Sequence, residues 1–97
     1  MAKYFLTNKA IEDISEIWNY TVKVSSENQA DNYYESLIEA CKEISEKPEI
    51  GKKYPEIDNE VLGYLSSRHI IFYRVNNQNE IEILRILYGS MDLKNRI

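Results

Sequence analysis

The strongest constraint on the fold of this 97-residue chain is a change in the spacing of its apolar residues partway along. In the first half, apolar side chains recur every three or four residues, which is the period of amphipathic helices. After residue 60, three runs are rich in β-branched and aromatic residues, which favour strands. A chain this short has room for one hydrophobic core. We therefore expect a single domain spanning residues 1–97, in which helices pack on a sheet.

The N-terminal segment predicts a short strand followed by a helix. Lys3-Tyr4-Phe5-Leu6 is apolar and ends at Thr7 and Asn8, two residues that favour helix N-caps. From there an apolar stripe runs from Ile11 to Val22, with acidic residues between its members. These features indicate a first helix that begins at Asn8.

A second helix is expected after Ser26-Glu27-Asn28-Gln29, which fits the capping-box pattern. Its apolar stripe runs from Ala30 through Leu37 to Ile44, and Pro48 ends it because proline cannot continue a helical turn. Residues 48–60 hold two prolines, a glycine and many charges, so we expect a connecting loop there. The two helices should form an antiparallel hairpin.

The remaining chain predicts three consecutive antiparallel strands, Val61–Leu65, Ile70–Val75 and Ile81–Tyr88. Asn76–Asn79 is predicted to form the hairpin turn between the last two strands. The last strand is apolar on both sides, which is typical of a strand inside a sheet. Residues 90–97 could form a short terminal helix. The expected fold is α+β, of order β-α-α-β-β-β, with a helical hairpin packed on a small, mainly antiparallel, four-stranded sheet.

The charge distribution bears on possible partners. The net charge of −4 disfavours a general nucleic-acid binder, and we expect no direct sequence-specific binding of nucleic acid. Residues 1–60 hold seven Lys and thirteen acids, whereas residues 61–97 hold five Lys or Arg and three acids. The basic C-terminal third is either a contact site for an acidic partner or an ordinary solvated surface.

Several classes of site and location are disfavoured by composition. Cys41 and His69 are the only cysteine and the only histidine, so neither an internal disulfide nor a Cys/His zinc cluster is expected, and no cofactor is indicated. The chain has no long apolar run and no signal-peptide pattern at its start. We expect a cytoplasmic protein that does not associate with membranes.

The order of segments resembles a known family. His69-Ile70-Ile71-Phe72-Tyr73-Arg74, followed by Ile83–Leu87 and then Met91-Asp92, resembles ParE-type toxins of the RelE/ParE superfamily, and the likeness spans nearly the whole chain. Asp13 in the first helix and the Pro48–Gly51 turn agree with it. The resemblance implies a type II toxin that traps DNA gyrase on cleaved DNA and is neutralised by a small antitoxin encoded beside it.

Two alternatives remain open, because a fold does not determine function. The RelE branch of the superfamily cuts messenger RNA on the ribosome, for which the candidate residues here would be Arg68, Arg74, Arg85 and Tyr88. Relatives of ParE type usually carry histidine at the position of Tyr88, so a non-toxic member that still binds antitoxin is also possible. The sequence offers few acid–base residues, and we expect His69 to be structural.

Two sets of residues are candidates for contact with partners. The antitoxin groove is expected beside the helical hairpin, at Trp18, Val22, Tyr34 and Leu37, because antitoxins of this superfamily add a strand to a sheet edge or a helix to a groove. The second set, for the target, is drawn from the basic C-terminal part of the chain: Arg74, Arg85, Tyr88, Met91, Asp92, Lys94 and Arg96.

The arginines within the strands have a second interpretation. An arginine in an apolar strand must reach an edge, a partner or a carboxylate, because burying it unpaired is costly. An internal salt bridge with Glu82 or Asp92 is therefore as reasonable for Arg74 and Arg85 as a contact with the target.

Overall fold

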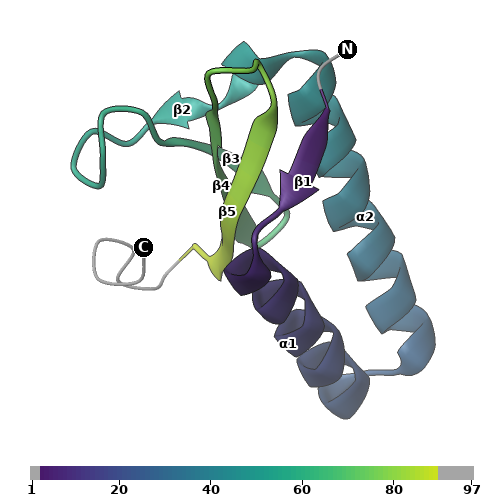
Figure 1. Cartoon of the computed structure of the whole chain (residues 1–97). Coiled ribbons are helices and arrows are strands. Elements are labelled where there is room, and N and C mark those ends of the chain that lie inside the picture. Colours follow the sequence, from purple (N-terminus) through teal and green to yellow (C-terminus); the bar gives the residue numbers. More distant parts are fainter. Residues whose placement is uncertain (1–2, 90–97) are drawn as a thin grey trace.

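The computed structural model describes residues 3–89 and confirms an α+β fold. Two helices pack on a sheet whose strands lie in the order β1-β5-β4-β3-β2 (Figure 1). All neighbouring strands are antiparallel except β1 and β5, which are parallel. The elements in chain order are β1 (Tyr4–Leu6), α1 (Asn8–Val24), α2 (Glu27–Glu46), the 3-10 helix η1 (Pro48–Ile50), β2 (Lys52–Lys53), β3 (Leu62–Ser66), β4 (His69–Val75) and β5 (Ile81–Tyr88).

The sheet has five strands where the sequence predicted four, and this expectation was wrong for a physical reason. The additional strand, β2, has two residues and lies within the segment predicted as a loop. It pairs with Gly63 and Leu62 of β3 at the edge of the sheet. Two exposed lysines show no alternation of polar and apolar residues, so only the pairing with β3 defines them as a strand. The predicted place of β5 inside the sheet is confirmed.

Both helices begin at the predicted caps. The Thr7 hydroxyl accepts a hydrogen bond from the Ala10 amide, and the Ser26 hydroxyl accepts one from the Gln29 amide. Each cap pairs an amide that the first turn of a helix leaves without a partner. The second helix ends at Glu46, two residues before Pro48, as predicted. No helix among residues 3–89 has the length and apolar character needed to cross a bilayer.

The main core lies between the helical hairpin and one face of the sheet (Figure 1). Alternation along β4 places Ile71 and Tyr73 on this face, where they join residues of both helices. On the other face, Ile70 and Phe72 form a smaller cluster that is packed by Tyr54 from the loop after β2. β4 is therefore buried on both sides, although helices cover only one of them.

A β-bulge interrupts the pairing of β4 with β5. Phe72 pairs with Arg85 and Tyr73 with Ile83, so Leu84 is the extra residue. The Thr7 hydroxyl donates to the Leu84 carbonyl at 2.9 Å, and the Thr7 amide donates to the Ile83 carbonyl at 3.0 Å. The residue that caps α1 therefore also satisfies carbonyl groups at the bulge.

The turn after α2 is fixed by a buried tyrosine. The Tyr73 hydroxyl donates to the Pro48 carbonyl and accepts a hydrogen bond of 2.9 Å from the Gly51 amide. A Cβ at position 51 would lie 2.3 Å from that hydroxyl oxygen, so only glycine fits against the ring. This contact gives the Pro48–Gly51 turn its shape.

Candidate functional site

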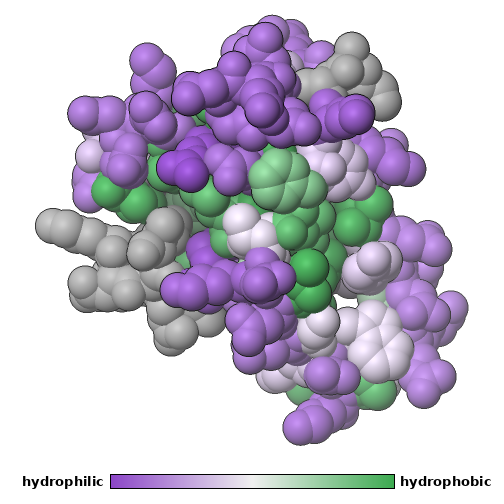
Figure 2. All heavy atoms as spheres, in the orientation of Figure 1, coloured by the Kyte–Doolittle hydropathy of each residue, from purple (hydrophilic) through white to green (hydrophobic). Residues whose placement is uncertain are grey.

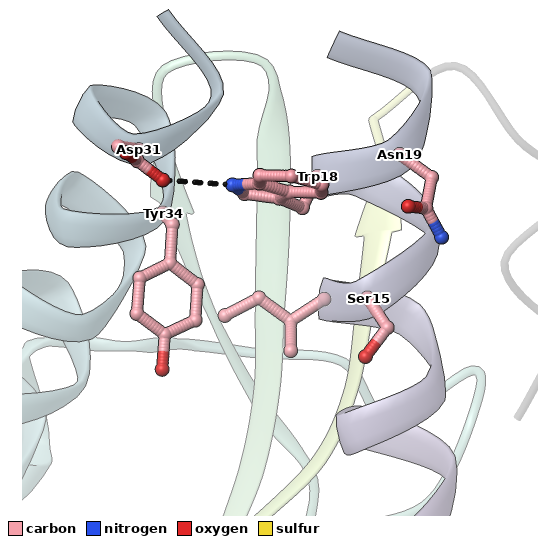
Figure 3. Close-up of a pocket in the computed structure, with 6 residues that line it drawn as sticks. Ser15, Trp18, Asn19, Asp31 and Tyr34 are labelled. Atoms are coloured by element: carbon pink, nitrogen blue, oxygen red, sulfur yellow. Dashed lines mark hydrogen bonds between the residues drawn. The ribbon is translucent and has the colours of Figure 1, made fainter. Parts of the chain in front are cut away.

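A pocket of about 390 Å³ lies between the two helices of the hairpin (Figure 3). The buried Ile14 forms its apolar floor. The aromatic rings of Trp18 and Tyr34 line it from α1 and α2. The rim is polar, with Ser15 and Asn19 from α1 and Asp31 from α2. The pocket combines an apolar floor, two aromatic side chains and a carboxylate.

Helical spacing explains how these side chains come together. Ile14 and Trp18 are four residues apart on α1, and Asp31 and Tyr34 are three apart on α2, so each pair shares one face of its helix. The Trp18 indole Nε1 donates to Asp31 Oδ1 at 2.9 Å, which links the two helices and orients both side chains (Figure 3). The pocket therefore forms where the two helix faces meet.

The structure separates the four groove candidates. Trp18 and Tyr34 line the pocket, and 43% of the Tyr34 surface is exposed. Val22 is half-buried on α1 and is not part of the lining. Placing Leu37 in the groove was wrong, because it is fully buried in the main core. It belongs to the inward stripe of α2, as the same sequence pattern also indicated.

Four lining residues were not among the groove candidates, namely Ile14, which the sequence assigned to the apolar stripe of the first helix, and three polar residues. Ser15, Asn19 and Asp31 are polar residues on exposed helix positions, a description that fits most of a hairpin's solvated surface. One signal was present, since Asp31 lies one helical turn before Tyr34 and so shares its face. The spacing of residues within one helix does not show which residues of the other helix lie opposite them.

Arg85 is anchored to the first helix. Its Nε and Nη2 donate to the two carboxylate oxygens of Asp13 at 2.8 and 2.9 Å, and the Ile86 amide donates to the same carboxylate at 3.0 Å. The pair is nearly buried, with side-chain exposures of 16% for Arg85 and 9% for Asp13. The hydrogen bond with Asp13 raises the pKa of Arg85. This bidentate pair fixes α1 against β5 beside the bulge.

Arg74 forms an internal salt bridge, which is one of the two interpretations that the sequence left open. Its Nε lies 2.7 Å from Glu82 Oε1 on the neighbouring strand, and the pair is more exposed than Arg85 and Asp13, at 45% and 18%. Arg68 has an exposed side chain in the turn before β4. The four ribonuclease candidates are thus not brought together as one charged group, since Arg74 and Arg85 each face a different carboxylate.

A cluster of rings surrounds the only histidine at one end of the sheet. The Tyr33 hydroxyl lies 2.6 Å from His69 Nδ1 and also accepts a hydrogen bond of 3.3 Å from the Arg68 amide. The His69 ring packs edge-on between Tyr33 and Tyr88, and 42% of the Tyr88 surface is exposed. Burial lowers the pKa of His69, opposed by the charge of Asp13, and therefore favours the neutral imidazole.

The other target candidates, Met91, Asp92, Lys94 and Arg96, and the predicted terminal helix lie outside the described residues. Within residues 3–89, no three His, Cys, Asp or Glu side chains gather as metal ligands. Burial raises the pKa of the Cys41 thiol to about 12, which keeps it protonated and unreactive at neutral pH.

Apolar residues also reach the surface near the sheet edge. On the face shown in Figure 2 they gather in a band across the middle, in the region where β1 and β5 lie in Figure 1, with polar residues above and below. Phe5 of β1 is 42% exposed, and Ile11 at the start of α1 is 50% exposed. This edge of the sheet is less polar than the opposite edge, which carries Lys52 and Lys53.

Comparisons with known proteins agree on one family. Residues 4–93 match the model of the ParE toxin of the type II toxin–antitoxin system parDE. Toxin ParE1 of Caulobacter vibrioides is 33% identical over 97 residues, covering 97% of this chain and 96% of that protein. Toxin ParE1 of Mycobacterium tuberculosis is 29% identical over 92 residues, covering 95% and 94%.

A solved structure has the same fold. A chain from the chromosomal ParDE TA system of P. aeruginosa superposes with a TM-score of 0.79, covering 91% of this chain and 96% of that one. Its sequence identity is 23%, so this likeness concerns the fold alone.

Proposed function

The chain belongs to the ParE toxin family of type II toxin–antitoxin systems, and we propose that it traps DNA gyrase on cleaved DNA and is neutralised by a small antitoxin encoded beside it. The observation that carries this proposal is the family match over residues 4–93, joined by relatives that align along nearly their whole length. On this proposal the chain acts as one domain in the cytoplasm, where gyrase and DNA are found.

Two surfaces suit an antitoxin. The pocket between α1 and α2 offers a groove for a helix. Strand β1 lies at the edge of the sheet and exposes Phe5, and it has no lysines like those of β2, which hinder pairing with another chain. An antitoxin that crosses both would cover the apolar band of Figure 2. Covering such a patch would also protect the toxin from aggregation.

For contact with the target we propose the end of the sheet at Arg68 and Tyr88, continuing into Met91, Asp92, Lys94 and Arg96. Arg68 and Tyr88 are exposed there, whereas Arg74 and Arg85 are held in ion pairs. A chain ending at Ser90 should lose toxicity while largely keeping its fold, as cooperative unfolding followed by circular dichroism would show. Full toxicity of that chain would contradict this assignment.

Cleavage of messenger RNA is the second candidate function, and one observation favours it. Tyr33, His69 and Tyr88 lie together, and the Tyr33 hydroxyl accepts the Arg68 backbone amide, so this cluster gathers side chains that are able to transfer protons. Because His69 Nδ1 is hydrogen-bonded to Tyr33, the imidazole has only one ring nitrogen left for such chemistry. We therefore place this function behind gyrase poisoning.

One pair of assays separates the two functions. Purified protein is added to gyrase, supercoiled plasmid and ATP, and in parallel to translating ribosomes with a defined message. Linear plasmid that appears only when toxin and gyrase are both present is the expected result. Cleaved message with unaffected gyrase would establish the ribonuclease, and no effect in either assay would favour a non-toxic member that binds antitoxin.

A further inference from the structure

We propose that the pocket between α1 and α2 binds an arginine side chain of the antitoxin. The guanidinium would lie against the rings of Trp18 and Tyr34 and pair with the carboxylate of Asp31. This inference rests on the proposed function, because it names the group by which the antitoxin is recognised. It follows from the pocket's walls, its charge and its size.

The walls suit a flat cation. The rings of Trp18 and Tyr34 come from two different helices (Figure 3), and both line the pocket together with Ile14. Aromatic faces attract cations through their quadrupoles, tryptophan most strongly, and arginine stacks on such rings more readily than lysine because its guanidinium is planar. The methylene groups of the arginine would contact Ile14, whose side chain forms the floor.

The charge of the surroundings is complementary to a cation. Asp31 is the only charged residue in the lining, and one of its oxygens accepts the Trp18 indole N–H, which leaves the second oxygen for another donor. Helix α2 carries six acids and one lysine, including Glu27 and Glu35 one turn on either side of Asp31. Within residues 3–89, Asp31 forms no salt bridge.

An apolar side chain would fit this pocket less well. It would remove the Asp31 carboxylate from water without supplying a donor, and desolvating an unpaired charge is costly. The volume of about 390 Å³ is near the lower end of small ligand pockets, which span about 300–1,000 Å³. One long side chain with its head group is an occupant of suitable size.

The test compares two variants of the toxin that each lose one negative charge. Asp31→Asn removes the carboxylate but keeps an oxygen that can accept the Trp18 N–H, so the pocket should retain its shape. Glu35→Gln makes the same change one turn away at an exposed position outside the lining. We expect Asp31→Asn to weaken binding of the co-expressed antitoxin about tenfold, and Glu35→Gln to weaken it less than twofold.

The antitoxin supplies the second half of the test. Each of its arginines is replaced in turn by methionine, which keeps length and removes charge, and every variant is titrated against wild-type toxin and Asp31→Asn. One arginine should show a loss that Asp31→Asn largely abolishes, as a coupled pair does in a double-mutant cycle. Because Trp18 is the only tryptophan, fluorescence of the toxin reports the pocket directly, provided the antitoxin carries none.

Equal effects of Asp31→Asn and Glu35→Gln, or no arginine coupled to Asp31, would overturn the arginine assignment while leaving the toxin–antitoxin pair intact. Failure of wild-type toxin to bind the antitoxin would instead refute the proposed function. The two failures are therefore distinguishable within one set of titrations.

Discussion

Asp13→Asn should destabilise the protein severely, and Glu82→Gln makes the matched comparison. Both remove one charge from an arginine–carboxylate pair of similar length, 2.8 Å for Arg85 with Asp13 and 2.7 Å for Arg74 with Glu82. The two pairs differ mainly in burial and in the number of bonds. The Asp13 carboxylate accepts three hydrogen bonds at a nearly buried site, whereas the other pair lies at the surface.

The expected costs follow from that difference. Removing one partner of a buried ion pair typically costs about 3–5 kcal/mol, because the remaining charge loses a strong interaction at a site where water cannot fully replace it. The asparagine oxygen can still accept the Ile86 amide, so we expect the lower end, about 3 kcal/mol. An exposed pair contributes about 0–1 kcal/mol, which is the expected cost of Glu82→Gln.

Urea unfolding followed by circular dichroism at pH 7 measures both values. With a slope of about 1 kcal/mol per molar urea, the Asp13→Asn midpoint should fall by about 3 M and the Glu82→Gln midpoint by less than about 1 M. If wild-type stability is near the lower end of the usual range, about 5 kcal/mol, Asp13→Asn should retain about 2 kcal/mol, so that about 3% of its molecules would be unfolded at room temperature. Equal shifts for the two variants would refute the reasoning that burial sets the cost.

Three further predictions concern other parts of the fold. Gly51→Ala should lower the free energy of unfolding by more than about 1 kcal/mol, because its Cβ would meet the Tyr73 ring. Gly89→Ala should lower it less, because its Cβ would lie 3.6 Å from the nearest atom, the Arg68 carbonyl oxygen. Since burial lowers the pKa of His69, the unfolded chain binds a proton at a higher pH than the folded chain, so the free energy of unfolding should fall as pH drops below about 6.5. Urea titrations at pH 7.5 and 5.5 should show this loss in wild type but not in His69→Gln. Leu37→Asp should abolish the native circular dichroism spectrum, because it buries an unpaired charge in the main core.

Local signals in the sequence were enough for most of the fold. Thr7 and Ser26 fixed where the helices begin, and the run from Ile81 to Tyr88 was predicted with the bounds that the structure shows. These features depend on neighbours a few residues away, which the sequence displays directly. Strand β2 was not predicted, because only its pairing with β3 defines it as a strand.

The candidate site depends instead on contacts distant in sequence. Glu82 was a candidate partner because of its place on the neighbouring strand, and it lies only eight residues from Arg74. Asp13 lies 72 residues from Arg85, and no periodicity connects two residues so far apart. The family resemblance singled out both Asp13 and Arg85 but did not show that they form a pair. The same limit applies to Trp18 and Asp31, which belong to different helices.

The anchor and the pocket are connected through adjacent residues of α1. Asp13 points to the bulge of β5, and the next residue, Ile14, forms the floor of the pocket. Successive residues of a helix face directions about 100° apart, so one turn of α1 contacts both the sheet and α2. Releasing Asp13 from Arg85 should therefore loosen the pocket as well as the core. For any Asp13→Asn protein that remains folded, we expect weaker antitoxin binding and stronger acrylamide quenching of Trp18, although Asp13 does not line the pocket. Glu82→Gln should change neither, because its salt bridge joins β4 to β5 and includes no residue of a helix.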